Sequence, residues 1–211
     1  MKNLIIIGAG GMGKQLYFFA QACAGYKTEY VIKGFIDDNI HALDGYEGYP
    51  PVIGTIMEYQ PVNDDVFTIS IGDVHIKKEC VSRIAERGGE FINLIHPQSS
   101  IPSHVKLGKG NILAARSGVG VESEIGDFNL IQDGALIGHD VKIGNWCRID
   151  CYAVLIAGVT LEDEVCIHTS AVINHDVTIG KGAMVGAQSF VFRNVKPGIT
   201  VFGNPAKKLI V

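Results

Sequence analysis

An aliphatic residue recurs at every sixth position through the second half of the chain. The run is unbroken from Ile101 to Val191, which is far beyond chance even where 47% of all residues are hydrophobic. Its members are Ile101, Leu107, Leu113, Val119, Ile125, Ile131, Ile137, Ile143, Ile149, Leu155, Leu161, Ile167, Ile173, Ile179, Val185 and Val191. A six-residue repeat of this kind predicts a hexapeptide parallel β-helix, in which three hexads make one triangular coil. We expect it to be left-handed, an exception to the usual right-handed crossover.

A second repeat accompanies the first. The position four residues after each aliphatic is small or β-branched in most hexads, and Asn111 and Asn129 are the exceptions. Residues 107–196 therefore supply five coils of eighteen residues each. The tail 197–211, "PGITVFGNPAKKLIV", is expected to fold back as a cap over the open end of the helix.

Residues 1–95 follow a different pattern, in which apolar runs alternate with helical stretches. The strand "NLIII", the turn "GAGGMGK" and the amphipathic "QLYFFAQACA" are followed by strands "YVIKGFIDD" and "VFTISIG", a helix around "IKKECVSRIAERG" and a strand "EFINLI". This order predicts an α/β Rossmann-like half domain over residues 1–95. The all-β left-handed β-helix then occupies residues 96–211.

The first turn of the α/β domain carries a glycine fingerprint. Gly8, Gly10 and Gly13 form G-x-G-x-x-G between a strand and a helix, and Asp37 ends the next strand. Only one mononucleotide-sized half is present, so a nucleotide sugar fits better than a nicotinamide dinucleotide, with its diphosphate at the helix N-terminus. The alternative is that the glycines serve only a tight turn and close helix packing. The candidate substrate-binding residues here are Gly8, Gly10, Gly11, Met12, Gly13, Asp37, Asp38, Gly72 and Asp73.

Composition excludes several classes of function. A net charge of −4 and no basic stripe argue against nucleic acid as a partner. No apolar stretch is long enough for a signal peptide or a membrane span. The five cysteines are odd in number and include no C-x-x-C pair, so we expect reduced thiols and a cytoplasmic location.

Two histidines stand in near-identical stretches, "LIGHDVKIG" at 136–144 and "VINHDVTIG" at 172–180. His139 and His175 are separated by two full coils, so they share one edge of the prism, roughly 10 Å apart. One ion within one chain cannot bridge that distance. A γ-class carbonic anhydrase, also a hexapeptide helix, needs a second histidine where this chain has Gly180, and His168 has the wrong spacing. We therefore expect no metal, and we read His175 as a solvated edge residue.

The whole chain resembles the PglD/NeuD-type sugar O/N-acetyltransferases. The resemblance is carried by "IIIGAGGMGK", "GFIDD", "ISIGD", "LIHPQSSI", "IGHDVKIG" and "GNPAKKL" in this order, together with the hexapeptide register. It implies acetyl transfer from acetyl-CoA to the amine of a nucleotide-linked amino sugar, of the UDP-4-amino-sugar type, in glycan biosynthesis. The resemblance also implies a homotrimer that binds the coenzyme in the groove between adjacent β-helices. The family's catalytic histidine falls on His139, its orienting acid on Asp140, and its backbone oxyanion donor on Ala157.

These residue types suit the reaction. A neutral imidazole, whose ordinary pKa is about 6.5, can take the proton of an attacking amine, and a backbone N–H can hold the developing oxyanion. Adjacent residues of a flat strand point to opposite faces. Asp140 can therefore orient His139 only at a corner of the prism or from another chain.

The sequence departs from the family at three positions around the site. Gly138 stands where an acid often precedes the histidine, Gln132 where an asparagine is usual, and Arg148 where a second histidine is common. Gln132 and Arg148 are therefore candidate acceptor-binding residues. Two alternatives remain open: an O-acetyltransferase acting on sialic acid or another sugar hydroxyl, and an inactive sugar-nucleotide-binding protein. The coenzyme candidates are Ala157, Gly186, Ala187, Gly203, Asn204, Pro205 and Lys207.

Overall fold

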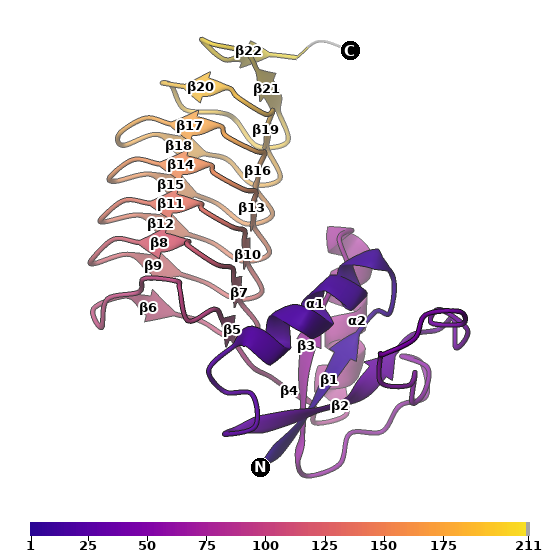
Figure 1. Cartoon of the computed structure of the whole chain (residues 1–211). Coiled ribbons are helices and arrows are strands. Elements are labelled where there is room, and N and C mark those ends of the chain that lie inside the picture. Colours follow the sequence, from indigo (N-terminus) through magenta and orange to yellow (C-terminus); the bar gives the residue numbers. More distant parts are fainter. Residues whose placement is uncertain (210–211) are drawn as a thin grey trace. The chain divides into compact units, whose positions relative to one another are not determined.

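The computed structural model describes residues 1–209, so Ile210 and Val211, the end of the predicted cap, lie outside the described residues. The chain divides into two compact units, Met1–Leu94 and Ile95–Val211 (Figure 1). Among the residues described, none of the helices has the length and apolarity that a membrane crossing requires.

The first unit is a four-stranded parallel sheet with two helices. The strand order is β2-β1-β3-β4. Its elements are β1 (Lys2–Ile7), α1 (Gly11–Ala22), β2 (Tyr30–Ile36), β3 (Asp65–Ile69), α2 (Val74–Glu86) and β4 (Glu90–Phe91). The aliphatic run Leu4–Ile7 of the central strand β1 is fully buried, as in a sheet covered on both faces. The predicted Rossmann-like architecture is confirmed, although α1 begins at the glycine turn itself, earlier than the amphipathic stretch suggested.

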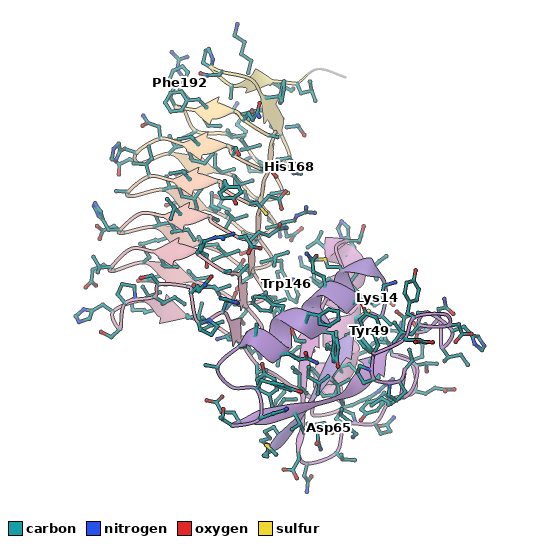
Figure 2. The ribbon with its side chains drawn as sticks, in the orientation of Figure 1. Lys14, Tyr49, Asp65, Trp146, His168 and Phe192 are labelled. Carbon is teal, nitrogen blue, oxygen red and sulfur yellow. The ribbon has the colours of Figure 1, made fainter. Side chains whose placement is uncertain are left out.

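An ion pair between partly exposed Lys33 and buried Asp65 links β2 and β3 of this unit. Asp65 is almost fully buried, and its carboxylate accepts hydrogen bonds from Lys33 Nζ at 2.8 Å and Tyr59 Oη at 2.7 Å (Figure 2). Burial by itself raises the pKa of a carboxyl group, but the hydrogen bonds from Lys33 and Tyr59 outweigh it, and the pKa of Asp65 lies below its ordinary value.

Asp65 should therefore make the unit sensitive to acid. A lowered folded-state pKa means that the stabilisation is complete above the unfolded value of about 3.9 and is lost as the pH falls through the folded value. Asp65→Asn is expected to reduce the free energy of unfolding at pH 7 by about 2–3 kcal/mol. This is less than the usual cost of breaking a fully buried ion pair, because Lys33 is partly exposed to solvent. Urea unfolding at pH 7 and pH 3 measures both effects. The idea fails if the difference between wild type and Asp65→Asn is as large at pH 3 as at pH 7.

The second unit is a parallel β-helix with three faces, which confirms the predicted left-handed hexapeptide fold. Face 1 consists of β5 (Leu94–Ile95), β7 (Ile112–Leu113), β10 (Leu130–Ile131), β13 (Arg148–Ile149), β16 (Cys166–Ile167), β19 (Met184–Val185), β21 (Thr200–Phe202) and β22 (Lys207–Lys208). Face 2 consists of β8 (Gly118–Val119), β11 (Leu136–Ile137), β14 (Val154–Leu155), β17 (Val172–Ile173) and β20 (Phe190–Val191). Face 3 consists of β6 (Lys106–Leu107), β9 (Glu124–Ile125), β12 (Lys142–Ile143), β15 (Thr160–Leu161) and β18 (Thr178–Ile179).

The six-residue aliphatic repeat fills the interior of the prism. From Leu113 onward every member of the run is buried. From Gly110 to Gln188 each corner closes through a residue in the left-handed region, and these residues also recur every six positions, for example Asp140 at φ 57° and Trp146 at φ 63°. The two repeats together explain why side chains at equivalent places in successive coils stack in columns parallel to the helix axis.

The two asparagines that break the small-residue pattern form a buried ladder. Asn111 Oδ1 accepts from the Asn129 N–H, and Asn129 Oδ1 accepts from the Cys147 N–H. Their amide groups donate to the carbonyls of Gly126 and Gly144. Both side chains thus satisfy backbone groups of the neighbouring coils, which is how a polar residue is tolerated inside the prism.

The outward side chains differ sharply between faces. On face 3 they are all polar or charged: Lys106, Glu124, Lys142, Thr160 and Thr178. On face 2 they are apolar, and Leu136, Val154, Val172 and Phe190 form one continuous column above Gly118. We call this column the apolar stripe. Leu136 is 51% exposed, so in the single chain this surface faces solvent.

Candidate functional site

His139 lies in the turn that joins face 2 to face 3. The same turn in the next two coils holds Ala157 and His175, and we call this column the histidine corner. Backbone hydrogen bonds join successive coils at this corner. The Gly158 N–H donates to the His139 carbonyl at 3.1 Å, and the Asp176 N–H donates to the Ala157 carbonyl at 3.1 Å. His139 and Ala157 are therefore direct neighbours, whereas His175 lies one coil further along the axis.

Asp140 contacts His139 within the same chain. His139 Nδ1 and Asp140 Oδ2 are 2.6 Å apart, and both side chains are 63% exposed. The left-handed backbone at Asp140 turns its side chain back onto its neighbour, which a flat strand would not allow. With the Nδ1 proton directed at the carboxylate, the imidazole presents Nε2 to the solvent with a free lone pair. No equivalent contact is made by His175 among the described residues.

The backbone N–H of Ala157 donates no hydrogen bond to any residue within 1–209. Gly138 lies directly beneath it, and a Cβ built at Gly138 would stand 2.8 Å from Ala157 N and 3.0 Å from the Ile156 carbonyl carbon. A side chain at Gly138 would therefore force this peptide to shift. The glycine that departs from the family pattern therefore has a local steric reason in this chain.

Gly138→Ala is expected to lower kcat by about 10- to 100-fold, because it must push the Ala157 N–H out of position, and losing such a donor outright costs about 10²–10³. Gly144→Ala is the matched control. A Cβ there would also meet the next coil, 2.9 Å from Asp163 N, but on the far corner between faces 3 and 1. Thermal unfolding should show similar losses of stability for both variants. An equal loss of kcat in both would rule out a special role for the Ala157 peptide.

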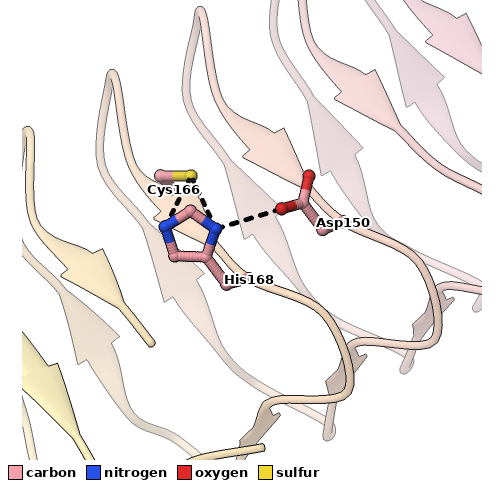
Figure 3. A group of neighbouring side chains, drawn as sticks. All are labelled: Asp150, Cys166 and His168. Atoms are coloured by element: carbon pink, nitrogen blue, oxygen red, sulfur yellow. Dashed lines mark hydrogen bonds and ion pairs between the residues drawn. The ribbon is translucent and has the colours of Figure 1, made fainter. Parts of the chain in front are cut away.

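Gln132 and Arg148 do not lie at the histidine corner of their own chain. They belong to face 1 and to the turn that follows it, where they contact Asp150 and His168, two residues that were not among the predicted site residues (Figures 2 and 3). Asp150 Oδ1 accepts from Arg148 Nε at 2.6 Å and from Gln132 Nε2 at 3.0 Å. Asp150 Oδ2 lies 3.2 Å from Arg148 Nη2 and 3.1 Å from His168 Nδ1. We call these four residues the polar cluster; the signal in the sequence was the eighteen-residue spacing of Gln132, Asp150 and His168.

Three side chains of this region could in principle ligate a metal. Asp150, Cys166 and His168 each bring one ligand atom within 4.8 Å of the others (Figure 3). However, the four N–H donors around Asp150 already occupy the acceptor positions of its carboxylate. Burial raises the pKa of the Cys166 thiol to about 11, which disfavours the thiolate that a metal needs. Hydrogen bonding within the polar cluster therefore accounts for this arrangement without an ion.

The glycine turn of the first unit lines a pocket. Its walls include Gly8, Gly10, Gly11, Met12 and Gly13 from the turn, Asp37 and Asp38 after β2, and Ser70, Ile71 and Cys80. A Cβ at Gly13 would collide with the Gly8 carbonyl, so the helix can approach the strand only with glycine there. The α1 N-terminus has no side-chain cap and no acidic residue in its first turn, which leaves its N–H groups directed at the pocket.

The acidic candidates of this pocket have backbone partners. Asp37 accepts from the Ala9 and Asn39 N–H groups, and Asp38 Oδ1 accepts from the Ile56 and Met57 N–H groups. Asp73 is the N-cap of α2, where its carboxylate accepts from two N–H groups of the first turn. Neither Gly72 nor Asp73 lines the pocket; the residues that line it directly after β3 are Ser70 and Ile71.

A second pocket lies at the C-terminal end of the β-helix, above the histidine corner. Four cations line it: Arg193, Lys196, Lys207 and Lys208. Of the predicted coenzyme residues, Pro205 and Lys207 also line it, whereas Gly203 and Asn204 stand just before them in the cap. Phe192, labelled in Figure 2, forms part of its apolar wall. Gly186 and Ala187 lie elsewhere, after β19 on face 1.

Comparisons with known proteins match both units of the chain. Residues 3–84 match the PglD N-terminal domain and residues 71–176 match the GMPPB C-terminal domain. The GDP-perosamine N-acetyltransferase of Escherichia coli O157:H7 is 28% identical over 214 residues, which cover 97% of this chain and 95% of that protein.

Two solved structures share the complete architecture. PerB from Caulobacter crescentus, in complex with CoA and GDP-perosamine, superposes with a TM-score of 0.86 at 25% identity and covers 99% of this chain and 98% of its own. The acetyltransferase domain of PglB from Neisseria gonorrhoeae, in complex with acetyl coenzyme A, has a TM-score of 0.87 at 28% identity, with 99% of each chain covered. Both similarities extend through both units of the chain.

Proposed function

Because this chain belongs to the PglD/NeuD-type family of sugar acetyltransferases, with residues 71–176 in the GMPPB C-terminal domain family, we propose that it transfers acetyl from acetyl-CoA to the amine of a nucleotide-linked amino sugar. The observation that carries this proposal is the arrangement of His139, Asp140 and the free Ala157 N–H on one corner. These are the groups that an amine and a thioester need in order to react without a covalent enzyme intermediate.

In the proposed reaction His139 is the general base. The neutral amine attacks the thioester carbonyl carbon while His139 Nε2 removes the amine proton, and Asp140 stabilises the imidazolium through Nδ1. The Ala157 N–H donates to the oxyanion of the tetrahedral intermediate. The carbon–sulfur bond then breaks, the coenzyme leaves with the proton returned by His139, and the sugar carries an amide.

The cationic pocket supports binding of the coenzyme along the histidine corner. Arg193 occupies the same column as His139, three coils higher, which is roughly 14 Å at the usual strand spacing. An extended pantetheine arm covers such a distance parallel to the axis. With phosphates at Arg193, Lys196, Lys207 and Lys208, the thioester would reach Ala157.

The glycine pocket is the proposed site for the nucleotide. The uncapped N-terminus of α1 suits a diphosphate. The carboxylates of Asp37 and Asp38 border the same pocket and offer their remaining acceptor capacity to a ribose or a base. All five cysteines are free, which supports a reducing compartment such as the cytoplasm.

The apolar stripe supports a homotrimer in which face 2 of each copy packs around a threefold axis parallel to the β-helix. Four stacked apolar side chains on one face, opposite a fully polar face 3, need a partner to cover them. Such a threefold keeps equal coils at equal heights. It brings the histidine corner of one copy, between faces 2 and 3, beside the edge between faces 1 and 2 of the next copy.

An acceptor panel tests the proposed function. Release of free CoA from acetyl-CoA would be measured with GDP-perosamine, dTDP-4-amino-4,6-dideoxyglucose, a UDP-linked 4-amino sugar and sialic acid. We expect turnover with at least one of the nucleotide-linked amino sugars and none with sialic acid. Turnover confined to sialic acid would make the chain an O-acetyltransferase, and no turnover with any acceptor would favour a binding protein.

A further inference from the structure

The polar cluster lies at the edge of face 1, level with the histidine corner. Gln132 belongs to the same coil as His139, and Asp150 belongs to the same coil as Ala157. In the trimer described above, equal coils meet across the copies. The cluster of one copy then borders the groove that contains His139 and Ala157 of its neighbour.

Asp150 is the fixed centre of this cluster. Its side chain is only 6% exposed, and its two oxygens receive four N–H groups from Gln132, Arg148 and His168. Burial of the Arg148 guanidinium acts to lower its pKa, but the hydrogen bond to Asp150 outweighs this effect, so the pKa of Arg148 is raised. A carboxylate with every acceptor position filled holds its partners in place and has none left for substrate.

The partners keep free atoms that point outward. Arg148 is 46% exposed, and within residues 1–209 its Nη1 has no acceptor. His168 is 32% exposed, and with its Nδ1 proton on Asp150 its Nε2 is an acceptor whose nearest polar neighbour is the weakly donating Cys166 thiol at 3.7 Å. One donor beside one acceptor complements a hydroxyl group, which both accepts and donates. Asp150 and Arg148 cancel in charge, so the cluster offers little attraction to a carboxylate.

We propose that Asp150 is a positioning residue for the acceptor: it holds Arg148 and His168 against a hydroxyl of the amino sugar whose amine faces His139 of the neighbouring copy. The inference rests on the proposed function. It assigns specificity for the sugar ring to a network that spans three coils of face 1.

Steady-state kinetics with GDP-perosamine and dTDP-4-amino-4,6-dideoxyglucose test the role of Asp150. Asp150→Asn should raise the acceptor KM by at least about tenfold while the KM for acetyl-CoA changes less than about twofold. Arg148→Met should do the same, and the double variant should be no worse than the worse single variant, since both remove one network. Asp163→Asn, which removes a carboxylate that accepts from Asn145 on the far corner, should leave the acceptor KM unchanged.

Mixed trimers test the position across copies. His139→Ala chains, which lack the general base, and Arg148→Glu chains, in which the reversed charge is expected to abolish acceptor binding, would be co-expressed with different tags and purified through both. If the cluster serves the neighbouring copy, one site of each mixed trimer is intact, and activity should return to about one third of wild type. No recovery in mixed trimers would place the cluster in the site of its own chain and overturn the proposal.

Other outcomes are equally informative. If the wild-type enzyme turns over these acceptors and Asp150→Asn has an unchanged acceptor KM, this inference is overturned and the proposed function is left intact. Absence of wild-type turnover would overturn the proposed function itself. One zinc per chain in the purified enzyme, lost in Cys166→Ser, would show that Asp150 and His168 serve a metal instead.

Discussion

His139→Asn is expected to lower kcat by about 10²–10⁴-fold, the range attributed to a general base, with little change in either KM. Asparagine keeps a polar side chain of similar reach but cannot take a proton from the amine. The exposed setting of His139 means that the substitution removes no packing, so the melting temperature should stay within a few degrees of wild type. Initial rates at saturating acetyl-CoA and acceptor measure the effect.

Two other histidines provide matched controls. His104 also contacts a carboxylate, with Nδ1 3.0 Å from Glu122 Oε1, but lies near the opposite end of the β-helix from the cationic pocket. His175 repeats the sequence setting of His139 without the contact to its following acid. His104→Asn and His175→Asn should both keep kcat within about threefold of wild type. A loss of activity at His175 equal to that at His139 would mean that the corner needs both imidazoles and that the single-base assignment is wrong.

Val154→Glu is expected to convert the proposed trimer into single chains and to reduce activity more than about 100-fold. Val154 lies in the middle of the apolar stripe, so three copies around a threefold axis would bring three carboxylates into one apolar interface. Desolvating an unpaired charge there costs several kcal/mol per copy, enough to reverse assembly. A site shared between copies would be lost with the interface.

Thr160→Glu is the matched control on face 3, where the outward column already contains Lys142 and Glu124. It should remain trimeric and active. Sedimentation equilibrium and circular dichroism together separate loss of assembly from loss of folding. A Val154→Glu protein that stays trimeric would show that another face forms the interface.

The fold could be predicted from the sequence because periodicity alone specifies it. A buried aliphatic every six residues fixes both the interior of the prism and the eighteen-residue coil, so the positions of His139 and His175 on one corner follow from counting. Asn111 and Asn129 did not disturb the pattern, because each side-chain amide donates a hydrogen bond to a backbone carbonyl of a neighbouring coil and is therefore tolerated inside the prism. The glycine turn was equally predictable, because Gly8 has a φ of 94° and Gly13 packs directly against the Gly8 carbonyl.

The site could be predicted only in part. The contact of Asp140 with His139 depends on the left-handed backbone at Asp140. From the sequence this contact could be made either at a corner of the prism or from another chain, and the sequence could not distinguish the two. The contact between Asp150 and His168 could not be predicted, because the two residues lie in different coils and their residue types fit a surface strand equally well. A position directly after a strand, such as that of Asp73, is typical both of a helix N-cap and of a binding residue, and the structure shows the N-cap contacts.

The most direct test of the account is the bond that the enzyme forms. The product of incubation with ¹³C-acetyl-CoA and the best amino-sugar nucleotide of the panel would be examined by NMR. The account predicts that the labelled carbonyl carbon is bonded to a sugar nitrogen as an amide. It also predicts that His139→Asn forms this product at least about 100-fold more slowly. A labelled ester on a sugar hydroxyl, or an amide formed at the same rate without His139, would contradict it.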